Sequence, residues 1–120
     1  MTVSMVVLAT RPPEWTKEEF TAWWRGPHAG FAKKLPQLVA YRHGEVVYDY
    51  DHPDQPAWDG NAVLTFPTRA ALDAAMQSPE WAAAVAHTGK MKGKRIILIT
   101  DEVDLLQGDV STTDTLAAKS

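Results

Sequence analysis

Residues 16–41, TKEEFTAWWRGPHAGFAKKLPQLVAY, are the stretch of this sequence that decides the fold. At helical spacing, one face of the stretch is aromatic or apolar around a single imidazole. That face carries Phe20, Trp24, His28, Phe31 and Leu35, with Trp23 at its edge. Thr16 and Glu19 have the spacing of a capping box, which predicts that the helix begins there. A titratable group inside a tryptophan-rich face is unusual, so His28 is the first candidate for function.

Two prolines shape this helix. Gly26-Pro27 predicts a kink or a restart just before His28, because proline is best tolerated in a first helical turn. Leu35-Pro36 predicts the end of the helix.

Four segments have the pattern of strands, and two further helices lie between the last two of them. The strands are residues 3–9 (VSMVVLA), 39–48 (VAYRHGEVVY), 60–66 (GNAVLTF) and 95–100 (RIILIT). One helix is predicted over residues 68–76, capped by Thr68, and a shorter one runs from its cap Ser78 to about His87. The order β-α-β-β-α-β predicts an α+β protein with a ferredoxin-like sheet and its helices on one face.

The first and last strands are apolar on both faces, but the helices can cover only one of the two faces of the sheet. A second copy of the sheet is the simplest cover for the other face. We therefore predict a homodimer whose sheets close face to face, a dimeric α+β barrel with a cavity inside. Residues 1–106 are expected to form this one domain, and residues 107–120 a polar C-terminal tail.

Composition excludes several classes of protein. A chain of 120 residues fits one domain, and its net charge of −3 without basic clusters argues against a nucleic-acid partner. There is no cysteine, so disulfides and thiolate sites are excluded. The N-terminus lacks a signal-peptide pattern, and no stretch is long and apolar enough to span a membrane. The expectation is a soluble, cytoplasmic protein without a membrane partner.

His28 could simply pack at the edge of the core. Its setting among Trp23, Trp24 and Phe31 favours a functional role instead. Desolvation lowers the pKa of an imidazole and keeps it neutral, which is the form that acts as a general base near neutral pH.

The other candidates are weaker. Tyr41 and His43 share the mixed face of the second strand, where Tyr41 could be a packed aromatic residue and His43 could pair with Glu45. His52 lies in the proline- and aspartate-rich loop of residues 49–59, where it is either a surface residue or part of a lid. His87 ends the last helix, where a structural role is the alternative.

The sequence predicts neither a metal nor an organic cofactor. Asp49, Asp51, His52 and Asp54 lie close together but lack the glycine and the closing glutamate of a calcium loop. The chain also has no glycine-rich phosphate loop and no Gly-x-Ser-x-Gly nucleophile elbow. The predicted chemistry is therefore proton transfer in a dry aromatic cavity.

Several short motifs stand in order along residues 5–105. They are the run from Phe20 through Trp24 and His28 to Leu35-Pro36, then Tyr41, Trp58-Asp59-Gly60, Ala71-Leu72, Met76, Ser78-Pro79-Glu80-Trp81 and Thr100-Asp101-Glu102. Together these motifs resemble the EthD family of dimeric α+β barrels. The resemblance implies a cofactor-free isomerase, cyclase or dehydratase acting on a small hydrophobic substrate of the lactone or polyketide type.

By position, the resemblance implies that His28, Tyr41 and His52 are catalytic. We add, as candidate substrate-binding residues, Trp24, Phe31, His43, Trp58, Trp81 and His87. Two alternatives remain open. One is a non-catalytic barrel that binds a small apolar molecule, and the other is a cofactor-free or haem-dependent monooxygenase like those of sister families with the same barrel.

Overall fold

The computed structural model describes residues 2–89 and 93–107. Its strands are β1 (Thr2–Ala9), β2 (Ala40–Glu45), β3 (Gly60–Phe66) and β4 (Arg95–Glu102). Its helices are α1 (Lys17–Trp23), the π-helical turn η1 (Trp24–His28), α2 (Ala29–Ala32), α3 (Arg69–Met76) and α4 (Pro79–His87). Residues 108–120, which hold nearly all of the predicted tail, lie outside the described residues.

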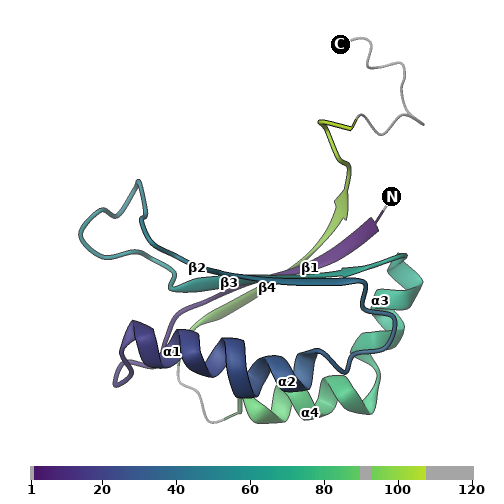
Figure 1. The fold of residues 1–120 in the computed structure, drawn as a ribbon, viewed down its shortest axis with the longest axis horizontal. Coiled ribbons are helices and arrows are strands. Elements are labelled where there is room, and N and C mark those ends of the chain that lie inside the picture. The colour runs from purple at the N-terminus through teal and green to yellow at the C-terminus, as the bar shows by residue number, and fades with distance from the viewer. Residues whose placement is uncertain (1, 90–92, 108–120) are drawn as a thin grey trace.

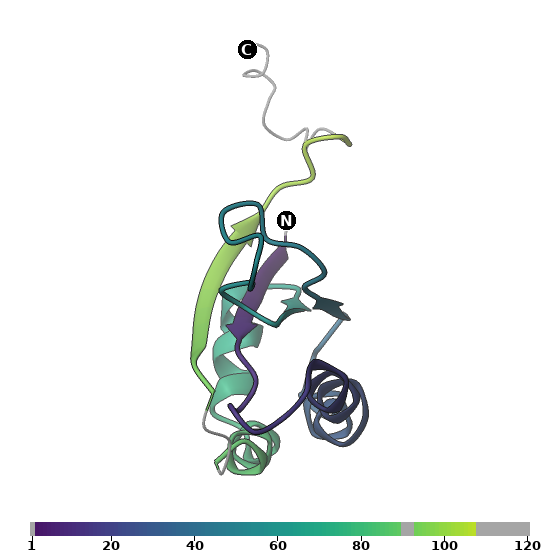
Figure 2. The ribbon, with the colours of Figure 1, turned by 90° about the vertical axis from the view of Figure 1, so that its left-hand side faces the viewer.

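The four strands form one antiparallel sheet in the order β2-β3-β1-β4. This is the ferredoxin-like arrangement, so the predicted fold class is confirmed. The helices gather on one side of the sheet, and the long β2–β3 loop extends beyond its edge (Figure 1). Turned by 90°, the molecule shows the opposite face of the sheet without a helix over it (Figure 2).

The first helix begins as predicted. The Thr16 hydroxyl accepts a hydrogen bond from the backbone N–H of Glu19 at 3.0 Å. In return, the Glu19 carboxylate accepts one from the backbone N–H of Thr16 at 2.8 Å. This reciprocal capping box satisfies two backbone donors that the first helical turn leaves unpaired.

The predicted kink takes the form of a wide π-helical turn. Pro27 lies inside η1, and α2 begins directly after His28, at Ala29. Proline has no N–H to donate to the preceding turn and its ring crowds that turn, so local widening accommodates it. The α-helical geometry then ends at Ala32, three residues before the predicted end at Leu35.

The second strand is shorter than predicted, ending at Glu45 where residues 39–48 were expected. Its register explains the difference, because Glu45 pairs with Gly60, the first residue of β3. One more backbone hydrogen bond joins Val46 to Asp59 before the chains separate. Beyond this point Val47 and Tyr48 are exposed, so they begin the loop.

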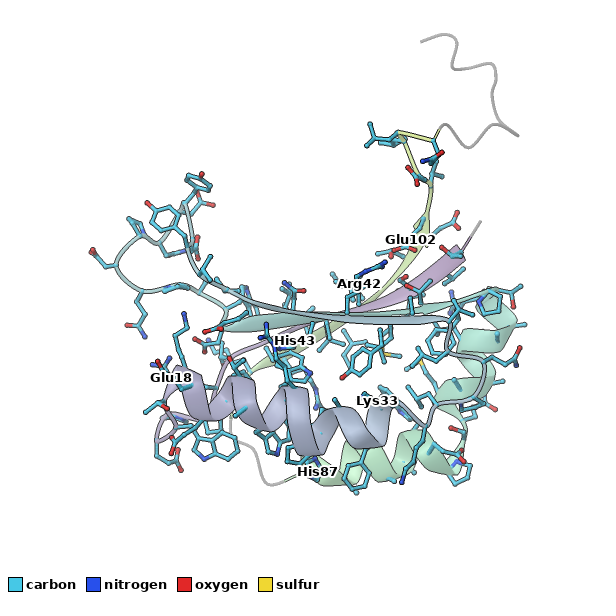
Figure 3. All side chains as sticks on the ribbon, viewed as in Figure 1. Glu18, Lys33, Arg42, His43, His87 and Glu102 are labelled. Atoms are coloured by element: carbon cyan, nitrogen blue, oxygen red, sulfur yellow. The ribbon has the colours of Figure 1, made fainter. Side chains whose placement is uncertain are left out.

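The core lies between the helices and the sheet. Its fully buried centre holds Met5, Phe20, Phe66 and Leu72, which come from two strands and two helices. Adjacent side chains of β2 point to opposite faces of the sheet: His43 points toward the helices and Arg42 points away from them (Figure 3).

The uncovered face of the sheet carries an apolar strip along its β1–β4 side. The register sets Val6 opposite Leu98 and Leu8 opposite Ile96, on the face opposite to Met5. Leu98 is 49% exposed and Ile96 is 39% exposed, which is high for large apolar residues of a sheet. Both apolar faces predicted for these strands are therefore present, and the chain alone covers one of them. Among the described residues, no helix has the length and hydropathy needed to cross a membrane.

Candidate functional site

A pocket of about 80 Å³ lies under the helices of a single chain. Its floor comes from the sheet, including β4, and its walls come from the helical layer. Most of the lining is apolar; the side chains with polar atoms are Trp23, Trp24, His28, Tyr41, Trp81, Thr88 and Arg95. This pocket of the single chain lies between sheet and helices, because the aromatic face of the first helical segment turns toward the sheet. The cavity predicted between the two sheets of a dimer is a separate space that needs a partner chain, and it stays a prediction.

Two histidines 59 positions apart in the chain meet at the pocket wall. Nδ1 of His28 lies 3.0 Å from Nδ1 of His87, which is hydrogen-bond distance. His28 comes from the end of η1 and lines the pocket, whereas His87 ends α4 and lies behind it. Figure 3 shows His87 at the foot of the helical layer, on the side away from the sheet.

Aromatic rings hold this pair on both sides. Trp23 stacks on His28 with ring centres 4.5 Å apart, and on His87 at 5.2 Å. Phe31 stacks on His87 at 4.5 Å, and the two imidazoles are themselves nearly parallel. Phe31 does not line the pocket, so its observed contact is with His87. The stack fixes both rings in orientation and removes water from their faces.

The surroundings of His28 favour its neutral form. Burial, and then the positive charges available at His87 and Arg95, lower the pKa of His28 from 6.5 to about 4. The desolvation foreseen from the tryptophan-rich sequence is thus the main cause. At neutral pH the imidazole carries one proton and one free lone pair.

Tyr41 and Trp24 also line the pocket. Tyr41 extends from β2, where it pairs with Leu64 of β3 on the helix side of the sheet. Burial raises the pKa of Tyr41, and a hydrogen bond with the side chain of Trp24 partly offsets this effect. The phenol therefore remains a proton donor at neutral pH. Trp81, another predicted binding residue, also lines the pocket.

His43 lies beside the pocket and does not line it. Its Nδ1 accepts a hydrogen bond from Nε of Arg25 at 2.9 Å, and its ring meets Trp24 edge to face at 4.5 Å. Burial and then the Arg25 charge lower the pKa of His43 to about 4. Among the described residues, its Nε2 is the one buried side-chain nitrogen or oxygen without a hydrogen-bond partner.

The β2–β3 loop holds His52 and Trp58 away from the other candidates. His52 is exposed, and its Nδ1 lies 3.0 Å from a carboxylate oxygen of Asp49. Neither His52 nor Trp58 lines the pocket. A single chain therefore brings His28, Tyr41, Trp24, Trp81 and His87 together, and it does not bring His52 or Trp58 to them.

Arg95 was missed by the sequence reasoning. It stands at the first position of β4 and is the one permanently charged side chain among the described residues that line the pocket. Its Nη1 donates to the hydroxyl of Thr88 at 3.0 Å, which holds the guanidinium near the end of α4. The local sequence RIILIT offers no signal for this role, because it depends on the register of β4 with β1. Among the described residues, no cluster of three side chains is arranged to hold a metal ion.

These features define a class: a small α+β protein of ferredoxin-like topology, with a mainly apolar pocket under its helices and a histidine pair in the pocket wall. The EthD domain family matches residues 12–91, which is more than half of the chain. The chain belongs to the EthD family.

Solved structures with the same fold are numerous. An EthD-family protein from Bacillus halodurans is 21% identical, with a TM-score of 0.69, and the match covers 86% of this chain and all of that one. A dimeric protein of ferredoxin-like fold from Bacteroides fragilis is 15% identical, with a TM-score of 0.62 over 84% of this chain and 96% of that one.

A third neighbour bears the name of an enzyme class. It is a candidate antibiotic biosynthesis monooxygenase from Nitrosomonas europaea, 14% identical, with a TM-score of 0.58 over 85% of this chain and 90% of that one. At these sequence identities, the similarity to the three solved structures shows a shared fold alone. Among curated proteins there is no match.

Proposed function

We propose that the protein is a cofactor-independent enzyme of the isomerase or lyase type, which moves a proton on a small, largely apolar substrate. The observation that carries this proposal is a neutral histidine, His28, in the wall of an apolar pocket that also holds a phenol. A base, an acid and a dry site are the parts that such proton transfer needs.

His28 is the proposed general base. Nδ1 is engaged by His87, so Nε2 is the nitrogen that can meet a substrate C–H. The lowered pKa keeps this imidazole unprotonated at neutral pH and therefore ready to accept a proton.

Tyr41 and Arg95 complete the proposed chemistry. Removing a proton next to a carbonyl leaves an enolate, whose negative charge needs a cation or a hydrogen-bond donor. Arg95 supplies the cation at the pocket, and the phenol of Tyr41 supplies a proton that can be donated to substrate. The pair supports a carbonyl-containing substrate such as a lactone or a polyketide-like diketone.

The size of the pocket supports a small substrate. Its volume of about 80 Å³ is well below the ~300–1,000 Å³ of sites for drug-sized ligands. The aromatic lining from Trp23, Trp24 and Trp81 suits a flat, unsaturated ring.

We propose that the working protein is a homodimer formed through the uncovered face of the sheet. Exposed Leu98 and Ile96 support this assembly, and so does the dimeric state of the structural neighbour from Bacteroides fragilis. His52 stays a predicted catalytic residue, and a role for it would require a partner chain or a movement of the β2–β3 loop.

Deuterium exchange tests the proposal without requiring that the product be identified. Small lactones and 1,3-diketones are incubated with the protein in D2O, and loss of the C–H signal next to the carbonyl is followed by proton NMR. We expect the wild type to accelerate exchange for at least one compound. His28→Gln should slow it by about 10²–10⁴-fold, with Glu18→Gln, on the exposed side of α1, as the control.

Three results would contradict the proposal. Normal exchange by His28→Gln would move the base elsewhere, and no acceleration across the whole panel would remove proton transfer as the activity. Saturable binding of a panel compound without any exchange would support the non-catalytic binding protein instead.

A further inference from the structure

The contact between His28 and His87 links the pocket to the outside of the helical layer. We propose that the two histidines form a proton relay, in which His87 takes the Nδ1 proton of His28 while Nε2 of His28 takes a proton from the substrate. The inference rests on the proposed function of His28 and adds a residue that does not itself line the pocket.

The geometry permits one proton between the two rings. With Nδ1 facing Nδ1 at 3.0 Å, one ring must donate and the other must accept. Two neutral imidazoles satisfy this contact only as opposite tautomers. When His28 holds the proton on Nδ1, its Nε2 has a free lone pair toward the pocket, and His87 holds its proton on Nε2.

Both outer nitrogens can be reached. Nε2 of His28 and Nε2 of His87 make no hydrogen bond to another described residue, and both side chains are only partly buried. His28 lines the pocket and His87 does not, so the outer nitrogen of His87 is the one that can meet bulk water. The two rings thus connect the pocket to solvent in two steps.

The proton balance is simple. A substrate C–H bond breaks and an N–H bond forms at Nε2 of His28. At the same time the Nδ1 proton of His28 passes to Nδ1 of His87, and His87 releases its Nε2 proton to water. Both imidazoles end neutral with their tautomers exchanged, and the substrate anion remains beside Arg95. Reprotonation of the substrate by the reverse path restores the starting tautomers.

The surroundings give a physical reason for a relay. A positive charge on His28 is disfavoured by its burial and by the guanidinium of Arg95, which reaches the site from β4. The other groups packed on the pair, Trp23 and Phe31, bring no charge that could stabilise an imidazolium. Passing the second proton to His87 lets His28 act as a base without holding that charge.

The first test reads the tautomers directly. Protein labelled with 15N at histidine is studied by long-range 1H–15N NMR at neutral pH, without ligand. We expect His28 as the Nδ1–H tautomer, His87 as the Nε2–H tautomer, and a downfield proton shared between them. The opposite pair of tautomers, or two Nε2–H rings, the usual form in water, would overturn the relay.

The second test separates relay from positioning with two variants of His87. His87→Asn can still hydrogen-bond to Nδ1 of His28 but cannot pass a proton on, and His87→Phe keeps the ring stack without any nitrogen. We expect both variants to slow deuterium exchange by about 10–100-fold, less than loss of the base itself. Ala83→Ser, on the exposed side of α4, is the matched control.

The outcomes distinguish the two proposals. If His87→Asn keeps normal exchange while His87→Phe is slow, His87 only positions His28 and the relay is wrong. If His28→Gln is slow but both His87 variants are normal, the base assignment stands and the relay is wrong. If His28→Gln exchanges normally, the proposed function fails, whatever the NMR shows about the shared proton.

Discussion

The ring of Trp24 lies against the backbone of Gly60, so closely that a Cβ on Gly60 would meet the ring at 3.0 Å. The same Cβ would lie 3.2 Å from the backbone oxygen of Gly44 on the neighbouring strand. The preceding residue, Asp59, accepts hydrogen bonds from the backbone and the guanidinium of Arg11. The Asp-Gly pair at the start of β3 therefore has a structural reason: Asp59 ties down the chain between β1 and the first helix, and Gly60 makes room for Trp24.

Gly60→Ala should lower the free energy of unfolding by about 1–3 kcal/mol, because the added methyl overpacks the contact with Trp24. Gly30→Ala is the matched control, since a Cβ there meets nothing within 4 Å. In a helix, that change should be neutral or stabilise by up to ~1 kcal/mol. Urea denaturation of both variants measures the difference; equal effects would show that the Trp24 contact can relax.

Removing the Arg95 charge should raise the pKa of His28, because that charge is one of the causes that lower it. In Arg95→Gln we expect the His28 resonance to titrate at a higher pH than in wild type, as followed by NMR. Exchange of deuterium into a substrate should slow as well, since the enolate loses its cation. A variant with an unchanged His28 titration would mean that the guanidinium does not act on the pair.

Acidification should destabilise the fold between about pH 6.5 and pH 4. His28 and His43 titrate near 4 in the folded chain and near 6.5 when unfolded, so in this range the unfolded chain binds protons that the folded chain does not. Their stabilising effect is complete above pH 6.5 and is lost as the pH falls toward 4. Because both rings are partly exposed, each should contribute on the order of 1 kcal/mol.

Urea denaturation at several pH values measures this loss. The double variant His28→Gln, His43→Gln should have a flatter profile over the same range than the wild type. Profiles of equal slope would assign the acid sensitivity to other groups.

A charge on the uncovered face of the sheet should weaken the proposed dimer. Wild-type protein at low micromolar concentration should elute with twice the chain mass of 13.3 kDa, measured by size-exclusion chromatography with light scattering. Leu98→Lys buries a cation in the apolar strip and should raise the dissociation constant at least about tenfold, which is ~1.4 kcal/mol. Ala83→Lys, on the exposed side of α4, should leave the mass unchanged. A wild-type monomer would remove the dimer from the proposal.

The fold could be predicted because its signals are local. The capping box of Thr16 and Glu19, the caps Thr68 and Ser78 and the apolar strands all act within a few residues, and β3 has the predicted bounds. The end of β2 was missed because it depends on where β3 begins. Periodicity along one strand carries no information about its partner's first residue.

The site was predicted in part, for the same reason. The helix face with His28 and Trp24 could be predicted from spacing, and so could the face of β2 that Tyr41 shares with His43. The hydrogen bond between His28 and His87 and the position of Arg95 arise from packing between distant segments. No sequence pattern within either segment predicts them. The side of the sheet on which the pocket lies also depends on how the helices pack, so it could not be predicted from local sequence.

The wide turn at Trp24–His28 determines in which direction around the helix axis the following side chains of the helical segment point. A π-helical turn is equivalent to an α-helix with one extra residue, and one residue corresponds to about 100° of rotation. If the same residues formed regular α geometry instead, without the wide turn, α2 would be rotated about its axis by that amount. Ala29 and Ala32 would then leave the core, and His28 would no longer be aimed at the end of α4. The Gly-Pro pair thus sets the direction in which the candidate base points, without touching the pocket itself.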